Sequence, residues 1–136
     1  MDTSTNKRRP FFSIVIPCYN SGKTIGRLLE TITQQDLQKD DIQVIISDDC
    51  STESYQDVID QFKDRLFITQ VKTDYNYCPG NTRQKGADAA IGEWICFSDH
   101  DDEFVLGSLR HVKEAIKKGG CDTVLFAKFL KKTLSG

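Results

Sequence analysis

The chain has 136 residues, of which 38% are hydrophobic and 28% are charged, and its formal net charge is -2. These values are typical of one soluble globular domain. They exclude a disordered chain and a nucleic-acid partner held by bulk electrostatics, and no apolar run approaches the roughly 18 residues that a membrane-spanning helix needs.

In chain order, an apolar, β-branched run that ends at proline predicts a first buried strand at 11–17. A helix should follow, because four apolar residues fall at i, i+3, i+4 and i+7: Ile25, Leu28, Leu29 and Ile32. A second strand is predicted at 42–47. The next helix is expected to be capped by Ser51 or Thr52 and to bury Tyr55, Val58, Ile59 and Phe62.

The second half of the chain continues the alternation, with strands predicted at 66–71, 93–98 and 121–130. A long polar loop leads to an alanine-rich helix near 81–91, and one more helix is indicated by the spacing of Val105, Leu109, Val112 and Ile116. Strands that alternate with helices predict an α/β fold, a mostly parallel sheet with helices on both faces.

We interpret residues 1–10, which are polar, as a flexible leader before a single domain at 11–136. The five cysteines are scattered and odd in number. They therefore argue against a disulfide framework and a thiolate zinc site, and they favour a reducing, cytoplasmic location.

Polar residues directly follow three of the predicted strands, within "PCYN" (17–20), "DDCS" (48–51) and "DHDDE" (99–103). In open α/β sheets, ligands bind outside the carboxyl ends of the strands. The three clusters therefore predict a binding site at this edge of the sheet.

The first cluster opens "PCYNSGKT" (17–24), which ends like a phosphate-binding P-loop. We reject a P-loop because it needs glycine where this chain has Pro17, and proline fixes φ and offers no N–H. Two interpretations remain open. One is a plain strand-to-helix turn, and the other is a contact with a nucleobase or ribose through the ring of Tyr19 and the carbonyl of Pro17.

The second cluster holds two adjacent carboxylates, Asp48 and Asp49, which repel each other unless one has another partner. An aspartate after a strand is often only a turn former or a helix cap. It can also accept a hydrogen bond from a base N–H or a ribose hydroxyl. Both interpretations stay open.

The third cluster is acidic at four of the five residues from Asp99 to Glu103. Such crowding costs energy unless a cation binds, and carboxylate oxygens suit Mg²⁺ or Mn²⁺ better than zinc. The alternative is a solvated loop in which Asp102 or Glu103 favours the dipole of a helix that starts near Val105. We interpret His100 as pointing away from the site.

Two basic residues, Arg83 and Lys85, are expected at the start of the third helix, where positive charge opposes the helix dipole. Their placement calls for an anion or a carboxylate nearby. A diphosphate would serve, and so would Asp99 or Asp101.

Together, four segments in this order resemble the N-terminal half of a family 2 glycosyltransferase with the GT-A fold. They are "SIVIPCYNSGKTIGRLLETITQQ" (13–35), "VIISDDCST" (44–52), "GNTRQKGADAAIGEWICFSD" (80–99) and the D-x-D-type "DHDD" (99–102). The resemblance implies a nucleotide-diphospho-sugar donor, most often a UDP-sugar, held with Mn²⁺ or Mg²⁺, and transfer of the sugar to a hydroxyl acceptor.

The resemblance also implies roles for single residues at the nucleoside. Pro17, Tyr19 and Asn20 would lie along the base and ribose. Asp49, the second of its pair, would accept a hydrogen bond from the base.

At the diphosphate, the resemblance implies that Arg83 faces the phosphates or supports the acidic loop. Asp99 and Asp101 would form the D-x-D pair, with Asp101 as the direct metal ligand. The chain departs from the family pattern at Cys50, where glycine is most common, and at Gln84, where asparagine commonly follows the arginine.

In the family, the acceptor-binding part and the catalytic base of inverting members lie further along than this chain extends. We therefore expect a donor-binding part that lacks the base, turns over poorly or not at all, and could pair with a second copy at a sheet edge after the fifth strand. A nucleotidyltransferase and a non-catalytic, Mg²⁺-binding signalling module of the flavodoxin-like type are the alternatives.

Overall fold

The computed structural model describes residues 9–73 and 79–119. It contains one sheet in the order β3-β2-β1-β4, in which all three neighbouring pairs are parallel. The strands are β1 (Phe12–Cys18), β2 (Ile42–Asp48), β3 (Phe67–Lys72) and β4 (Trp94–Phe97). The predicted α/β class and mostly parallel sheet are confirmed.

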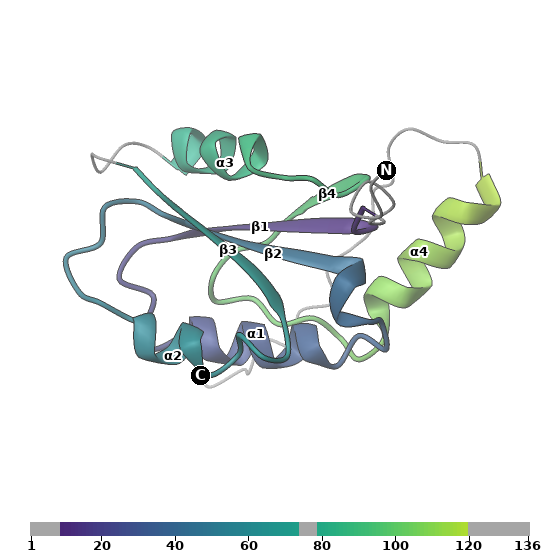
Figure 1. Ribbon diagram of the computed structural model, residues 1–136, viewed down its shortest axis with the longest axis horizontal. Coiled ribbons are helices and arrows are strands. Elements are labelled where there is room, and N and C mark those ends of the chain that lie inside the picture. The colour runs from purple at the N-terminus through teal and green to yellow at the C-terminus, as the bar shows by residue number, and fades with distance from the viewer. Residues whose placement is uncertain (1–8, 74–78, 120–136) are drawn as a thin grey trace, which may run out of the picture.

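Helices lie on both faces of this sheet, as predicted (Figure 1). Helix α3 (Pro79–Asp88) covers one face, and α1 (Ile25–Thr33) and α2 (Gln56–Asp60) lie along the other. Helix α4 (Ser108–Gly119) lies at the opposite end of the sheet from the loop that joins β2 to α2. Within the described residues, no helix is both long and apolar enough to cross a membrane.

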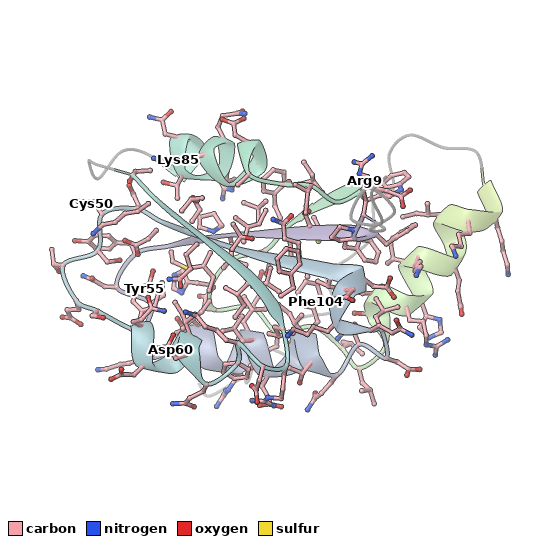
Figure 2. All side chains as sticks on the ribbon, in the orientation of Figure 1. Arg9, Cys50, Tyr55, Asp60, Lys85 and Phe104 are labelled. Atoms are coloured by element: carbon pink, nitrogen blue, oxygen red, sulfur yellow. The ribbon has the colours of Figure 1, made fainter. Side chains whose placement is uncertain are left out.

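The main core lies between the sheet and helices α1, α2 and α4. Alternate residues of β1 and β2 point into it, because successive side chains of a strand face opposite sides. The fully or nearly fully buried members from these strands are Phe12, Ile14, Ile16, Cys18, Ile42, Val44 and Ile46. Phe104, in the segment before α4, packs into the same core (Figure 2).

The opposite face of the sheet carries polar residues that hold α3 and the segment after it in place. Ser13 Oγ donates to Gln43 Oε1 at 2.6 Å, and Gln43 Nε2 donates to the carbonyl of Ala89 at 3.1 Å. Ser47 Oγ donates to the carbonyl of Thr82 at 2.7 Å. Helix α3 is poor in large apolar residues, so these hydrogen bonds supply much of what fixes its position.

Two of the predicted helices begin later than the sequence pattern indicated. Helix α2 begins at Gln56 without a side-chain cap, because Ser51 is engaged elsewhere: its Oγ donates to Asp48. Helix α4 begins at Ser108, after Gly107 with φ +74°, so Val105 lies outside the helix and is exposed.

Some predicted features fall wholly or mostly outside the described residues. The strand at 121–130, and the sheet edge expected after it, lie outside. So does the flexible leader up to residue 8. Of the expected leader, Arg9 and Pro10 are described. Arg9 donates to the carbonyls of Ile91 and Gly92 at 3.0 Å each, and Pro10 is buried.

Candidate functional site

A pocket of about 260 Å³ lies where β1, β2 and β4 end, at the edge of the sheet that the sequence predicted. Residues at and after the strand ends form most of the pocket wall, and Thr82 and Arg83 of helix α3 complete it. The lining residues are Pro17, Cys18, Tyr19, Asp49, Thr82, Arg83, Asp99, His100 and Asp101. The three polar clusters therefore do meet, because the carboxyl ends of parallel strands share one edge.

Most of the residues predicted for the site line this pocket: Pro17, Tyr19, Asp49, Arg83, Asp99 and Asp101. The sequence interpretation missed Cys18 and Thr82, which carried no recognisable chemistry in the sequence. It also placed His100 away from the site, and that was wrong. His100 lines the pocket, and its Nδ1 lies 2.7 Å from Thr24 Oγ1.

Asn20 is the predicted site residue that does not line the pocket. It has φ +48°, a conformation that asparagine tolerates well, and its Oδ1 accepts from the backbone N–H groups of Thr52 and Glu53 at 3.0 Å each. Its own backbone N–H donates to Ser51 Oγ at 2.8 Å. Asn20 thus ties the loop after β1 to the loop after β2, and it positions the pocket wall from behind.

The two adjacent carboxylates after β2 have different surroundings. Asp48 accepts hydrogen bonds from the backbone N–H and hydroxyl of Ser51 and from the hydroxyl of Tyr55, which makes it a structural turn former. Asp49 is 8% exposed, lines the pocket, and accepts from Thr73 Oγ1 at 3.0 Å. Both carboxylates therefore have partners within the chain, and Asp49 is the one that lines the pocket.

The residue after this pair, Cys50, has φ +54° and lies at the end of the molecule where the strands finish (Figure 2). This is the left-handed region, which costs a residue with a Cβ roughly 1–2 kcal/mol relative to glycine's free access. The departure from the family's common glycine therefore has a physical consequence, a strained turn beside Asp49.

The thiol of Cys18 and the hydroxyl of Tyr55 lie under the same turn. Burial raises the pKa of Cys18 from 9.0 to about 12, with a smaller contribution from the charge of Asp48. Burial, together with Cys18 and Asp48, also raises the pKa of Tyr55. Both groups are therefore protonated in the folded chain at pH values where the unfolded chain has begun to lose these protons.

This difference predicts alkaline instability. Below about pH 9 the contribution of Cys18 to the free energy of unfolding is fully present. Between pH 9 and 12 it falls by up to about 1.4 kcal/mol per pH unit, because only the unfolded thiol ionises. In urea unfolding across this range, Cys18→Ala should lose stability less steeply with rising pH than wild type does. An equal loss of unfolding free energy per pH unit in Cys18→Ala and wild type would contradict the raised pKa of Cys18.

The acidic loop after β4 brings three carboxylates together. One oxygen from each of Asp99, Asp101 and Asp102 lies within 4.8 Å of the others. Asp99 and Asp101 are exposed, whereas Asp102 is buried and its Oδ2 accepts from the backbone N–H of Asp99 at 3.1 Å. An all-carboxylate donor set fits Mg²⁺ or Mn²⁺. Asp102, which was predicted as part of the acidic cluster but not as a member of the D-x-D pair, belongs to this group of three.

Arg83 approaches the acidic loop from α3, with its Nη2 3.9 Å from Asp99 Oδ1. Both side chains are about half exposed or more, so this ion pair contributes little to stability. The helix begins at Pro79, a residue favoured at a first helical position, so Arg83 lies one turn inside and Lys85 lies in the last turn. The prediction that these residues oppose the dipole at the helix start was therefore wrong. Lys85 is exposed on α3 (Figure 2).

A larger hollow, of about 400 Å³, lies between the loop 51–56 and the end of β3. Asp48 faces it, but the carboxylate of Asp48 is already engaged by Ser51 and Tyr55. The smaller pocket unites polar groups from three strand ends with an arginine, and it is the better candidate for a binding site.

Comparison with known proteins gives an independent view of the chain. A family model described as glycosyl transferase family 2 matches residues 13–133. The poly(ribitol-phosphate) β-N-acetylglucosaminyltransferase TarS of Staphylococcus aureus is 31% identical over 116 residues, which are 84% of this chain and 20% of that protein. A GalNAc(5)-diNAcBac-PP-undecaprenol β-1,3-glucosyltransferase of Campylobacter jejuni is 29% identical over 115 residues, 81% of this chain and 36% of that protein. The chain thus spans between a fifth and about a third of these relatives.

Solved structures show the same fold. S. aureus TarS 1–349 in complex with UDP matches with a TM-score of 0.75 at 30% identity, covering 79% of this chain and 32% of that chain. The mannosyltransferase PcManGT from Pyrobaculum calidifontis, in complex with GDP-Man and Mn²⁺, matches with a TM-score of 0.71. Its identity is 22%, and the match covers 86% of this chain and 34% of that one, so this likeness concerns the fold alone.

Proposed function

Because the chain belongs to glycosyl transferase family 2, we propose that its pocket binds the nucleotide part of a sugar donor and that the protein transfers this sugar to a hydroxyl acceptor. In this proposal, residues 11–136 form the nucleotide-diphospho-sugar-binding part of a GT-A domain. The observation that carries it is the meeting of Asp49, Arg83, Asp99 and Asp101 in one pocket. A UDP-sugar is the proposed donor, since TarS is known in complex with UDP and with UDP-GlcNAc.

The part of the pocket beside β1 and β2 suits the base and ribose. Asp49 is buried, and a buried carboxylate repels phosphate but accepts hydrogen bonds from N–H and O–H groups. Tyr19 is 43% exposed at the pocket wall, so its ring has a face available for stacking. Pro17 adds an apolar wall and a carbonyl, and Asn20 holds this loop in place.

The part of the pocket beside β4 suits the diphosphate. Arg83 is a positive, half-exposed group that can contact phosphate oxygens, and its present partner, Asp99, lies at ion-pair distance. Asp99 and Asp101, supported by Asp102, would hold Mn²⁺ or Mg²⁺ as a D-x-D site, with Asp101 as the direct ligand. When bound, such an ion neutralises the charge that develops on the departing diphosphate.

A cytoplasmic location is part of the same proposal. It is supported by the scattered, odd-numbered set of cysteines and by Cys18, a buried free thiol in the described part of the chain.

Calorimetric titration of UDP into the chain, with Mn²⁺ and with EDTA, tests the proposal. We expect binding that depends on Mn²⁺. In Asp49→Ala, the UDP affinity should fall roughly 10- to 100-fold, because a hydrogen bond to a buried charged group is lost. Asp64→Ala is the matched control, since Asp64 is exposed and lies outside the pocket lining.

Two results would contradict the proposal. One is Mn²⁺ or Mg²⁺ binding that is indifferent to UDP, which would favour the signalling-module alternative. The other is UDP binding that Asp49→Ala leaves unchanged in a variant that melts like wild type.

A further inference from the structure

The hydroxyl group of Thr82 has no hydrogen-bond partner among the residues that the structure describes. Thr82 is 1% exposed, it lines the pocket, and in the described part of the chain its Oγ1 has no hydrogen-bond partner. A buried hydroxyl left in this state is unfavourable, and such groups in native structures call for an explanation. The backbone of the same residue is fixed, because its carbonyl accepts from Ser47 Oγ at 2.7 Å.

The surroundings of this hydroxyl limit what could satisfy it. The carboxylate of Asp49 lines the same pocket and is also buried, at 8% exposure. A buried carboxylate repels an anionic group, so the diphosphate belongs beside the positively charged and more exposed Arg83. In a bound nucleotide, a group that contacts both Thr82 and Asp49 would therefore belong to the uncharged nucleoside, and it must offer a donor to Asp49.

We propose that the Thr82 hydroxyl donates a hydrogen bond to a ring carbonyl of the nucleobase, adjacent to the N–H that Asp49 accepts. This inference rests on the proposed function and adds a specificity-determining residue to it. The Thr82 hydroxyl as donor and the Asp49 carboxylate as acceptor match the adjacent C=O and N–H groups of uracil or guanine. Held in the same place, cytosine presents an unprotonated ring nitrogen to Asp49 where uracil presents N–H, and an amino group to Thr82 where uracil presents a carbonyl, so this arrangement selects against cytosine.

Two substitutions isolate the hydroxyl. Thr82→Val replaces it with a methyl group of nearly the same shape, and Thr82→Ser keeps it. With Mn²⁺ present, we expect Thr82→Val to weaken UDP binding about 3- to 10-fold while CDP binding stays as in wild type. Thr82→Ser should stay within about twofold of wild type for UDP.

The melting temperature of the ligand-free protein is a second measurement. If Thr82 had a purely structural role, Thr82→Val would lower this temperature. Removing a buried polar group that lacks a partner is neutral or stabilising. Ligand-free Thr82→Val should therefore melt at or above the wild-type temperature, even though it binds UDP less well. A lower melting temperature combined with wild-type UDP affinity would overturn the proposal.

Comparing the binding of UDP, GDP and CDP distinguishes failure of this inference from failure of the proposed function on which it rests. If wild type binds UDP and GDP more tightly than CDP, the proposed contact with an N–H and C=O edge is supported. The tighter of UDP and GDP then identifies the base. If wild type binds UDP and Thr82→Val binds it equally, the Thr82 proposal falls and the proposed function stands. Equal losses for UDP and CDP would place the hydroxyl on ribose or phosphate and overturn the base contact. No UDP binding by wild type would remove both.

Discussion

Replacing both Asp99 and Asp101 by asparagine is expected to weaken Mn²⁺ binding on the order of 100-fold and to remove the metal dependence of UDP binding. Substituting groups that only support metal ligands costs 10- to 100-fold in affinity, so the loss of two direct carboxylates should cost at least as much. The amide keeps the size of each side chain but removes the charge that balances the cation. Asp102 stays unchanged, because it also accepts from the backbone N–H of Asp99.

The measurement is a titration of Mn²⁺ alone, followed by UDP at saturating Mn²⁺. Asp64→Asn is the control for a general loss of surface charge, since Asp64 is exposed outside the acidic loop. The fold should persist, because Asp99 and Asp101 are exposed. The ion pair of Asp99 with Arg83 is also half exposed and contributes little. Unchanged Mn²⁺ affinity in the double variant would place the metal elsewhere or remove it from the proposal.

Gly86→Ala is expected to lower the free energy of unfolding by about 1–3 kcal/mol, the usual cost of overpacking a core. A Cβ at position 86 would lie 2.5 Å from Val15 Cγ1 and 3.3 Å from Ser47 Cβ. Gly86 therefore lies where α3 approaches β1 and β2 closely. If the new Cβ pushes α3 away from the sheet, UDP binding should weaken too, because Thr82 and Arg83 lie on this helix one turn earlier.

A double-mutant cycle with Val15→Ala tests the cause. Removing the Val15 methyl groups makes room for the new Cβ, so Gly86→Ala should cost less in the Val15→Ala background than in wild type. Denaturant unfolding of the four proteins gives the coupling. Strictly additive effects would show that the cost of Gly86→Ala does not arise at this contact.

The site residues with distinctive chemistry were accessible from the sequence. Asp49, Asp99 and Asp101 follow strands that could be recognised from their apolar runs, and the rule for parallel sheets places strand ends together. The α/β fold was predicted from the alternation of strands and helices, and family membership from the resemblance of four segments. Both are confirmed. The reason is physical: strand position and polarity are encoded locally, and the topology rule then supplies the meeting point.

The boundaries that the sequence analysis placed wrongly depend on competition between distant groups. Ser51 could have capped the second helix, but its hydroxyl is taken by Asp48, which also holds the Tyr55 hydroxyl. Helix α3 begins at Pro79, before the alanine-rich stretch, so Arg83 is not a residue of the helix start. Local propensity does not reveal which of several possible partners a side chain takes.

The sequence by itself determined the order of strands and helices, the edge of the sheet that carries polar groups, and the acidic cluster that suits a divalent cation. Only the tertiary structure decided which member of each cluster faces the pocket. It turned Asp49 toward the pocket and left Asp48 to the turn, and it placed Asn20 behind the wall. It also buried the hydroxyl of Thr82 with no partner among the described residues. Burial and hydrogen-bond partnership arise from segments far apart in the chain, so no local pattern contains them.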